Sequence, residues 1–186
     1  FFIQKNMITL YPDQQSTVSK IKHEFSMGNR RVLMVSPTGS GKTVMFSYMC
    51  GEVLKKDKRV LIVTDRLELL TQASGTLSQF GLNADTIDAK TKELPFASPL
   101  VVAMSETLKR RLKKEEYQIL IRSFDLIVID EAHKNTFNKL WDYINPKTYV
   151  IGATATPERN GHKTPLKNYY HSIVLAKETS ELIKDG

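Results

Sequence analysis

Short apolar runs alternate with longer segments of mixed polarity along most of the chain. The runs are rich in valine, isoleucine and leucine, a pattern typical of strands that are buried on both faces of a parallel sheet. We therefore expect strands over residues 32–35, 60–63, 100–104, 126–129 and 149–151.

The segments between these runs carry apolar residues at helical spacing. Pro12 stands where a first helix can begin, since proline is favoured in the first turn, and Gly28 stands where that helix can end. Further helices are expected over residues 42–54 and 66–80, and a lysine- and arginine-rich helix pair over 107–123.

Two stretches are less regular. Pro95 and Pro99 interrupt residues 86–99, and the tail over 169–183 is expected to add a strand and a helix. Strands that alternate with helices of this length indicate an α/β fold, in which helices cover a mostly parallel central sheet. The sequence shows no repeat and no linker composition, so we expect one domain over residues 1–186.

Composition narrows the class of protein. Hydrophobic residues make up 41% and charged residues 25%, as in ordinary globular proteins. No apolar run approaches the roughly 18 residues of a membrane span. The lone Cys50 excludes a disulfide framework and a cysteine zinc site within the chain, and we expect it to be a small core residue. A cytoplasmic location is favoured.

The charge balance favours one kind of partner. Lysine and arginine total 27 against 20 acidic residues, which gives a formal net charge of +7. Such a surplus suits a polyanion such as nucleic acid, although many basic proteins bind none. The sequence begins at Phe1 without an initiator methionine, and we expect it to be a fragment of a longer chain.

A glycine-rich segment between the first expected strand and the next helix predicts a phosphate-binding loop. Its glycines let backbone amides converge on phosphate oxygens, and the helix that follows adds free N–H groups. Lys42 is expected to reach the β- and γ-phosphates and the Thr43 hydroxyl to bind Mg²⁺. The alternative is an ordinary glycine-rich turn, and Ser36 departs from the pattern, which has glycine there. The predicted nucleotide-binding residues of the loop are Thr38, Gly39, Ser40, Gly41, Lys42 and Thr43.

The sequence Asp130-Glu131-Ala132-His133 directly follows the expected strand over 126–129. Ligands bind at the carboxyl ends of strands in such sheets, so these side chains are expected on the same edge as the phosphate loop. Asp130 is placed to hold Mg²⁺ together with Thr43, and Glu131 to orient and deprotonate the water that attacks the γ-phosphate. His133 is expected to sense that phosphate. The alternative is that these are ordinary loop residues, since acidic residues are common after strands.

The phosphate loop together with the Asp-Glu-Ala-His sequence resembles the DEAH-type branch of superfamily two helicases and translocases. The similarity is to their first RecA-like domain, in the group of restriction-enzyme translocases and recombination helicases. The resemblance implies a RecA-like P-loop NTPase fold with helices on both faces of the sheet. It also implies ATP and Mg²⁺ as cofactors, Lys42, Asp130, Glu131 and His133 as catalytic residues, and nucleic acid as a partner.

Further segments follow in the order of that family. Residues 8–15 resemble the adenine-reading Q motif, with Gln14 as its key glutamine. Residues 63–72 resemble motif Ia, in which Arg66 would face the nucleic-acid backbone. Residues 152–159 are close to motif III, whose threonines, here Thr154 and Thr156, couple hydrolysis to movement.

The less specific of these motif residues can also have ordinary structural roles. Gln14 and Arg66 can be surface residues at helix starts, and Thr154 and Thr156 can simply bond a turn at a strand end. Ser105 and Thr107 occupy the place of a strand-contacting motif of the family, and we expect them to contact nucleic acid. Residues 109–114 form a basic run that is either a phosphate track or a solvated helix face.

Aromatic and histidine residues add no further site. Trp141, with Phe137 and Tyr143 nearby, can stack on bases, but packing of the helix after the acidic sequence is favoured. The histidines outside the acidic sequence lack metal-ligand spacing, so none is assigned a metal.

The resemblance implies an ATP-binding and ATP-hydrolysing motor domain at the amino-terminal side of a DNA helicase or translocase. We expect the second RecA-like domain, which carries arginine fingers in the family, to lie outside this chain, and we therefore expect slow turnover and a monomer. DNA is favoured over RNA. The alternatives are the motor segment of a restriction or defence nuclease, a nucleotide-switched nucleic-acid-binding module without unwinding, and an unrelated P-loop kinase or GTPase.

Overall fold

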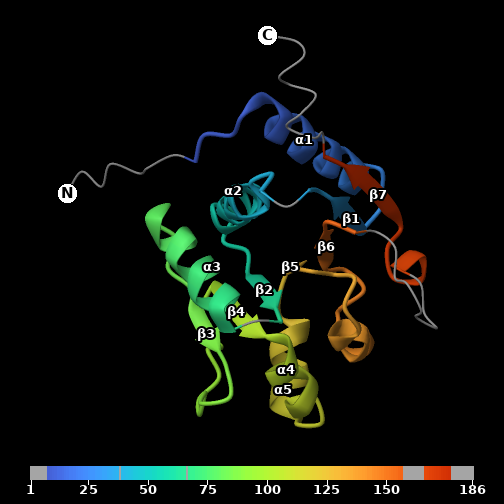
Figure 1. Cartoon of the computed structure of the whole chain (residues 1–186). Coiled ribbons are helices and arrows are strands. Elements are labelled where there is room, and N and C mark those ends of the chain that lie inside the picture. The colour runs from blue at the N-terminus through green and yellow to red at the C-terminus, as the bar shows by residue number, and fades with distance from the viewer. Residues whose placement is uncertain (1–7, 38, 66, 157–165, 177–186) are drawn as a thin grey trace.

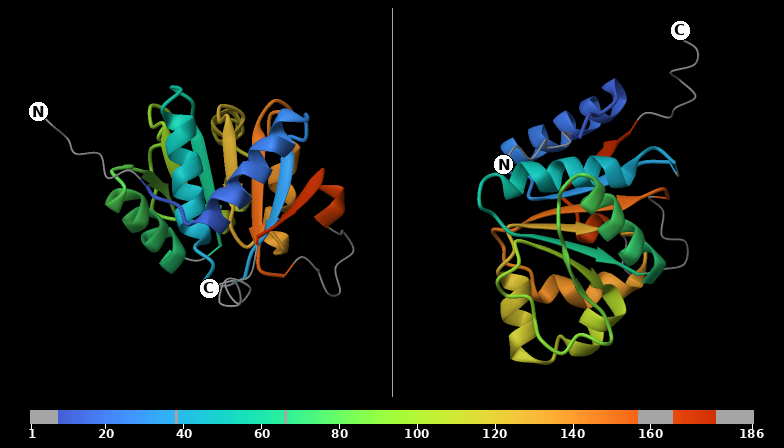
Figure 2. Two further views of the ribbon diagram at one scale, coloured as in Figure 1. Left: turned by 90° about the horizontal axis from the view of Figure 1, so that it is seen from above. Right: turned by 90° about the vertical axis from the view of Figure 1, so that its left-hand side faces the viewer.

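The structure, a computed structural model, describes residues 8–37, 39–65, 67–156 and 166–176 (Figure 1). Within them, a seven-stranded sheet has the order β3-β4-β2-β5-β6-β1-β7, and each neighbouring pair runs parallel. Helices lie on both faces of this sheet (Figure 2). The prediction of an α/β fold with a mostly parallel central sheet is confirmed.

The bounds of the elements follow the predicted pattern closely. The strands are β1 (Arg31–Val35), β2 (Val60–Thr64), β3 (Asp85–Ile87), β4 (Leu100–Met104), β5 (Leu126–Ile129), β6 (Tyr149–Thr154) and β7 (Ser172–Leu175). The α-helices are α1 (Pro12–Ser26), α2 (Lys42–Leu54), α3 (Leu67–Gln79), α4 (Ser105–Arg111) and α5 (Glu115–Arg122). Two 3₁₀ helices complete the described part, η1 (Asn135–Tyr143) and η2 (Leu166–Asn168).

The side chains of the strands alternate between two apolar layers. Leu33 of β1 belongs to the layer under α4, α5 and η1, whereas its neighbours Val32 and Met34 belong to the layer under α1, α2 and α3. The strands are apolar on both faces because helices cover both sides of the sheet. Cys50 of α2 is 0% exposed in the second layer, which confirms its prediction as a core residue.

The differences from the predicted elements have local causes. The strand β3 overlaps the start of the stretch predicted to be irregular. It has only three residues, of which Asp85 and Thr86 are exposed, so it carries no apolar run. The strand β6 continues to Thr154 because it pairs with β1 as far as Val35. Gly152 within it leaves room for Tyr170, since a Cβ atom there would lie 2.2 Å from the Tyr170 hydroxyl. The expected strand in the tail is β7, whereas residues 177–183 lie outside the described part.

Trp141 packs as the sequence favoured. It is 9% exposed on η1, stacks on Tyr169 with ring centroids 5.2 Å apart, and meets Tyr170 edge-on at 5.3 Å. Phe137, one turn earlier, is also buried in the same layer. Among the residues that the structure describes, no helix is long and apolar enough to span a membrane.

Candidate nucleotide-binding site

Three strand ends meet at one edge of the sheet. Val35, the last residue of β1, is in register with Thr154 at the end of β6, and Ile129 of β5 is in register with Gly152 of β6. The loop after β1, the acidic sequence after β5 and the end of β6 therefore lie side by side. Parallel strands bind ligands at this edge.

The loop after β1 has the backbone of a phosphate cradle. Gly39 and Gly41 both adopt left-handed conformations, with φ of 81° and 80°, which other residues resist. The helix α2 begins at Lys42, so its free N–H groups face the loop. The hydroxyls of Ser36 and Ser40 are hydrogen-bonded to each other across the base of the loop. Ser36, which stands where the phosphate-loop pattern has glycine, therefore has a structural role here. Thr38 lies outside the described residues.

Gln14 connects the first helix to this loop. Its side-chain Nε2 donates to the carbonyl oxygen of Ser40 at 3.3 Å, and its Oε1 accepts from the backbone N–H of Tyr11 at 3.1 Å. A Cβ atom at Gly41 would lie only 2.3 Å from Nε2, so the second glycine is needed for this approach as well as for its φ. Gln14 thus fixes the loop to α1. Its contact with adenine stays a prediction.

Lys42 and Glu131 face each other across the site, with Nζ 3.8 Å from Oε1. Glu131 has a φ of 53°, an uncommon conformation for a residue with a side chain and one that is enriched at functional sites. Two bonds hold this turn: Glu131 N–H donates to Asp130 Oδ1 at 3.0 Å, and Ala132 N–H donates to the carbonyl of Ala153 at 2.8 Å. The fold therefore maintains Glu131 opposite the lysine at some conformational cost.

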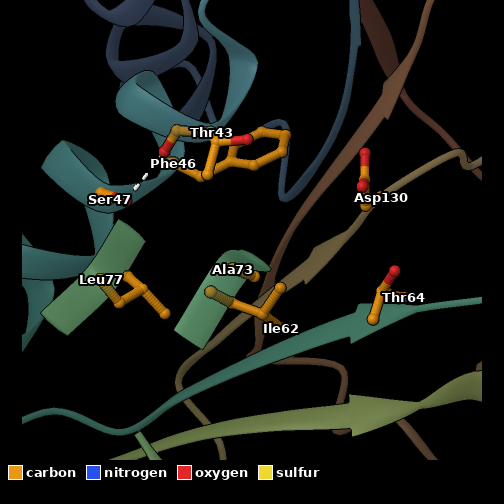
Figure 3. A pocket seen from close by; sticks show the side chains of 8 residues that line it. All are labelled: Thr43, Phe46, Ser47, Ile62, Thr64, Ala73, Leu77 and Asp130. Atoms are coloured by element: carbon orange, nitrogen blue, oxygen red, sulfur yellow. Dashed lines mark hydrogen bonds between the residues drawn. The ribbon is translucent and has the colours of Figure 1, made fainter. Parts of the chain in front are cut away.

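Asp130 is a partly buried carboxylate of the site. Burial raises its pKa above the ordinary value, the neighbouring Glu131 raises it further, and Lys42 opposes both effects. A divalent cation would relieve this penalty, because it favours the charged carboxylate. Asp130 and Thr43 line one small cavity, whose other walls come from α2, β2 and α3 (Figure 3).

The donor set fits Mg²⁺. A carboxylate and a hydroxyl are hard oxygen ligands, and Mg²⁺ takes one or two carboxylates and completes its shell with phosphates and water. In the described part of the chain, no three His, Cys, Asp or Glu side chains are grouped to hold a metal by themselves. A site built from Asp130, Thr43 and a nucleotide is compatible with that finding, whereas a cage made of protein ligands alone is not found there.

His133 links the acidic sequence to the end of β6. Its Nδ1 lies 2.9 Å from Thr154 Oγ1 and 3.4 Å from Glu131 Oε2. Thr154, which is 0% exposed, also donates to the carbonyl of Thr156 at 2.8 Å and accepts from the Thr156 N–H at 3.0 Å. The structure thus joins the predicted catalytic and coupling residues in one polar network.

The residues predicted to contact nucleic acid are less accessible. Ser105 and Thr107 of α4 are 2% and 8% exposed, and Arg66 lies outside the described residues. Their contact with nucleic acid stays a prediction.

The basic run divides into two roles. Arg111 is anchored by hydrogen bonds to the carbonyls of Thr91 and Ala89 and to the Tyr117 hydroxyl, at 2.8, 2.7 and 2.6 Å. Arg110, in contrast, is exposed on the same helix. The run is therefore neither a uniform phosphate track nor a wholly solvated face.

Sequence reasoning missed several residues that the fold brings to this edge. Lys134 forms an ion pair with Asp65, which follows β2. Thr64, the last residue of β2, lines the same cavity as Asp130. These contacts depend on β2 lying next to β5, which no local pattern shows. Thr64 and Asp65 fall within residues 63–72, the segment that resembles motif Ia, but that resemblance gave a role to Arg66 and none to these two residues.

A family model described as type III restriction enzyme, res subunit (ResIII), matches residues 7–159. The chain belongs to the ResIII family. The matched range of the ResIII domain begins before α1 and includes the phosphate loop, the acidic sequence and Thr154.

Relatives of the ResIII domain include both endonuclease subunits and helicases. It is 30% identical over 186 aligned residues to the type I restriction enzyme EcoAI endonuclease subunit of Escherichia coli, covering 93% of this chain and 22% of that protein. It is also 30% identical to IRC3 of Saccharomyces cerevisiae, which is provisionally named an ATP-dependent helicase, over 92% of this chain and 27% of that protein. The chain thus spans about a quarter of the length of these relatives.

The fold comparison agrees with the family. The structure of the Hef helicase domain of Pyrococcus furiosus superposes with a TM-score of 0.75 at 21% identity, covering 100% of this chain and 42% of that one. The predicted RecA-like fold is confirmed. The ResIII domain is a helicase-like domain, similar to the motor domains of superfamily two.

Proposed function

We propose that this domain binds and hydrolyses Mg-ATP as the first of two RecA-like domains in a DNA helicase or translocase. The observation that carries the proposal is the placement of Lys42 3.8 Å from Glu131, between the left-handed glycines of the loop and the His133–Thr154 contact. The family relationship supports the same activity. The domain over residues 1–186 would then be one half of the motor.

Each side chain has a role in the proposed reaction. The loop amides and Lys42 bind the β- and γ-phosphates, while Gln14 contacts adenine from the end of α1. Thr43 and Asp130 would hold Mg²⁺, which when bound neutralises charge on the β- and γ-phosphates. Glu131 accepts a proton from the attacking water as its oxygen bonds to the γ-phosphorus and the bond to the ADP oxygen breaks. His133 holds Glu131 and transmits its position to Thr154 and Thr156.

The partner in this proposal is nucleic acid, with DNA favoured over RNA. Arg66, Ser105 and Thr107 would track the sugar–phosphate backbone, so base specificity should be low. The net charge of +7 supports a polyanionic partner. A second RecA-like domain in the parent protein would supply arginine fingers, which are worth about 10³ to 10⁵ in rate, and this domain alone should turn over slowly as a monomer.

A fluorescent ATP analogue tests the nucleotide site on this chain directly. The unchanged chain should bind it with Mg²⁺, Lys42→Ala should weaken binding at least about tenfold, and Glu131→Gln should bind normally. In the parent protein, Glu131→Gln should slow hydrolysis by about 10² to 10⁴. Equal binding by Lys42→Ala and the unchanged chain would refute the assignment of the phosphate site.

The parent protein decides the partner and the motor role. Its ATP turnover is measured with single-stranded DNA, duplex DNA, branched DNA and RNA. Stimulation by one DNA form supports the translocase. A parent whose nucleic-acid affinity responds to ATP while its turnover responds to none of these polymers is instead a nucleotide-switched binding module.

One observation favours a second candidate function. The similarity to the EcoAI endonuclease subunit makes the motor segment of a restriction or defence nuclease a direct alternative. The two functions share the ATP site and differ in the rest of the parent chain. Cleavage of duplex DNA by the parent, dependent on ATP and lost in Lys42→Ala, would establish the nuclease alternative.

A further inference from the structure

Thr64 carries a buried hydroxyl that no part of the proposed reaction uses. The residue ends β2 and is 1% exposed. Among the described residues, its Oγ1 has no hydrogen-bond partner. A buried hydroxyl without a partner is costly, and in native proteins such groups are usually satisfied by a side chain, a ligand or an ordered water.

The sheet places this hydroxyl beside the predicted metal ligand. Val63 of β2 is in register with Ile129 of β5, and the Asp130 N–H donates to the Val63 carbonyl at 2.9 Å. Thr64 directly follows Val63 and Asp130 directly follows Ile129, so the two residues lie beside each other at the ends of adjacent parallel strands. Figure 3 shows both side chains rising on the same side of the sheet, the side on which α2 lies.

The small cavity that Thr64 and Asp130 both line has room for one water molecule. The cavity measures about 20 Å³, and a single ordered water needs about 10 to 15 Å³ and two to four polar partners. Its polar lining consists of Thr43, Ser47, Thr64 and Asp130. Ser47 donates its hydroxyl to the Thr43 carbonyl at 2.8 Å and keeps its lone pairs for an incoming donor. The remaining lining side chains are apolar: Phe46, Ile62, Ala73 and Leu77.

We propose that Thr64 is a positioning residue for Asp130: its hydroxyl binds one water in this cavity and through it orients the carboxylate that would hold Mg²⁺. The inference rests on the proposed function, since it assigns a partner to the metal ligand of that site. A group that hydrogen-bonds a metal ligand, without touching the metal itself, commonly weakens metal affinity by about 10- to 100-fold when it is removed. Thr64 acts from the strand next to Asp130, so it touches neither nucleotide nor metal.

The test replaces the hydroxyl and measures metal affinity rather than turnover. Thr64→Val keeps the shape of the side chain and removes the hydroxyl, while Thr64→Ser keeps the hydroxyl. Each variant of this chain is titrated with Mg²⁺ at a fixed concentration of a non-hydrolysable fluorescent ATP analogue. Thr64→Val should raise the half-saturating Mg²⁺ concentration about tenfold, and Thr64→Ser should stay within about twofold of the unchanged chain.

Two controls separate positioning from packing. Analogue affinity in EDTA and the melting temperature should be the same in Thr64→Val as in the unchanged chain. Ser172→Ala removes another buried hydroxyl that has no partner among the described residues, on β7 and outside this cavity, and should leave the Mg²⁺ titration unchanged. Thr64→Ala is measured beside Thr64→Val, so that a folding defect in one variant leaves the other to decide.

The outcomes are distinguishable. If the unchanged chain binds the analogue without any effect of Mg²⁺, the proposed nucleotide site itself fails. If it responds to Mg²⁺ and Thr64→Val responds at the same concentration, only the role of Thr64 is overturned. A Thr64→Val variant that is more stable, with an unaltered Mg²⁺ response, would mean that the hydroxyl is dry and serves packing alone.

Discussion

The Nδ1 atom of His133 lies 2.9 Å from Thr154 Oγ1 and joins the acidic sequence after β5 to the end of β6. Because Thr154 gives its hydroxyl hydrogen to the Thr156 carbonyl, the hydrogen in the contact with His133 must come from Nδ1. The same Nδ1 lies 3.4 Å from a carboxylate oxygen of Glu131, another acceptor. These bonds therefore assign a hydrogen to Nδ1 of His133, and this N–H faces two acceptors, Thr154 Oγ1 and Glu131 Oε2.

Thr154→Val should remove this junction while it preserves the volume of the side chain. The hydroxyl takes part in bonds to His133 Nδ1 and to the backbone carbonyl and N–H of Thr156, and the residue is fully buried. We expect the free energy of unfolding to fall by about 1–3 kcal/mol, or roughly 2–10 °C in melting temperature. Thr154→Ser keeps the hydroxyl and should lose less than half of that. Equal melting temperatures for Thr154→Val and the unchanged chain would show that the network contributes no stability.

Gly41→Ala should damage the phosphate loop more than Gly39→Ala. Both glycines have φ near 80°, so either substitution introduces left-handed strain of about 1 kcal/mol. Among the residues that the structure describes, the new Cβ at Gly41 would meet Nε2 of Gln14 at 2.3 Å, whereas a Cβ at Gly39 would have nothing within 4 Å apart from its chain neighbours. We expect Gly41→Ala to displace Gln14 and weaken binding of a fluorescent ATP analogue at least about tenfold, and Gly39→Ala to weaken it less. The opposite order would contradict the contact between α1 and the loop.

The elements with long apolar runs were predictable, because two-sided burial leaves a local signature. The strands over 100–104 and 126–129 match their predicted bounds. The three-residue β3 has no such signature, since two of its residues are exposed. The order of the strands was not predictable either, because it depends on which helix covers which face.

The same distinction holds at the candidate site. The phosphate loop and the acidic sequence are contiguous, so their residue types and spacing indicate their chemistry. The bond of Gln14 to Ser40, the ion pair of Lys134 with Asp65 and the position of Thr64 beside Asp130 arise between distant segments. They follow from the packing of α1 against the loop and from strand register, which one sequence alone does not supply.

The fluorescence of Trp141 should change when the protein unfolds and should not change when nucleic acid binds. It is the single tryptophan of the chain, stacks on Tyr169, and has the Arg31 guanidinium 5.0 Å from its ring centroid. Its emission should be blue-shifted and weakly quenched by acrylamide, and should change by less than about 10% when single-stranded oligonucleotide is added. Trp141→Ala should lower the free energy of unfolding by about 3–5 kcal/mol. Strong quenching by the oligonucleotide in the folded protein would instead support base stacking.

Cys50 should make stability depend on pH in the alkaline range. Burial raises the pKa of its thiol to about 12, whereas the thiol of an unfolded chain titrates near 8.5. Below about pH 8.5 both states keep the proton, so the thiol adds no pH dependence. Between there and pH 12 the unfolded state loses its proton first, so unfolding becomes easier as the pH rises. At pH 10 the loss should be about 2 kcal/mol relative to pH 7.

Cys50→Ala provides the comparison that isolates this effect. The variant should be less stable at pH 7, because it leaves space in the layer under α1, α2 and α3. Its stability should nevertheless fall less between pH 7 and pH 10, since the other titrating groups are common to both proteins. Denaturant titrations at the two pH values measure the difference, and Ellman's reagent at pH 8 should label the unchanged chain only after unfolding. Rapid labelling of the native chain, or parallel pH profiles for the two proteins, would show that the thiol is not held in the core.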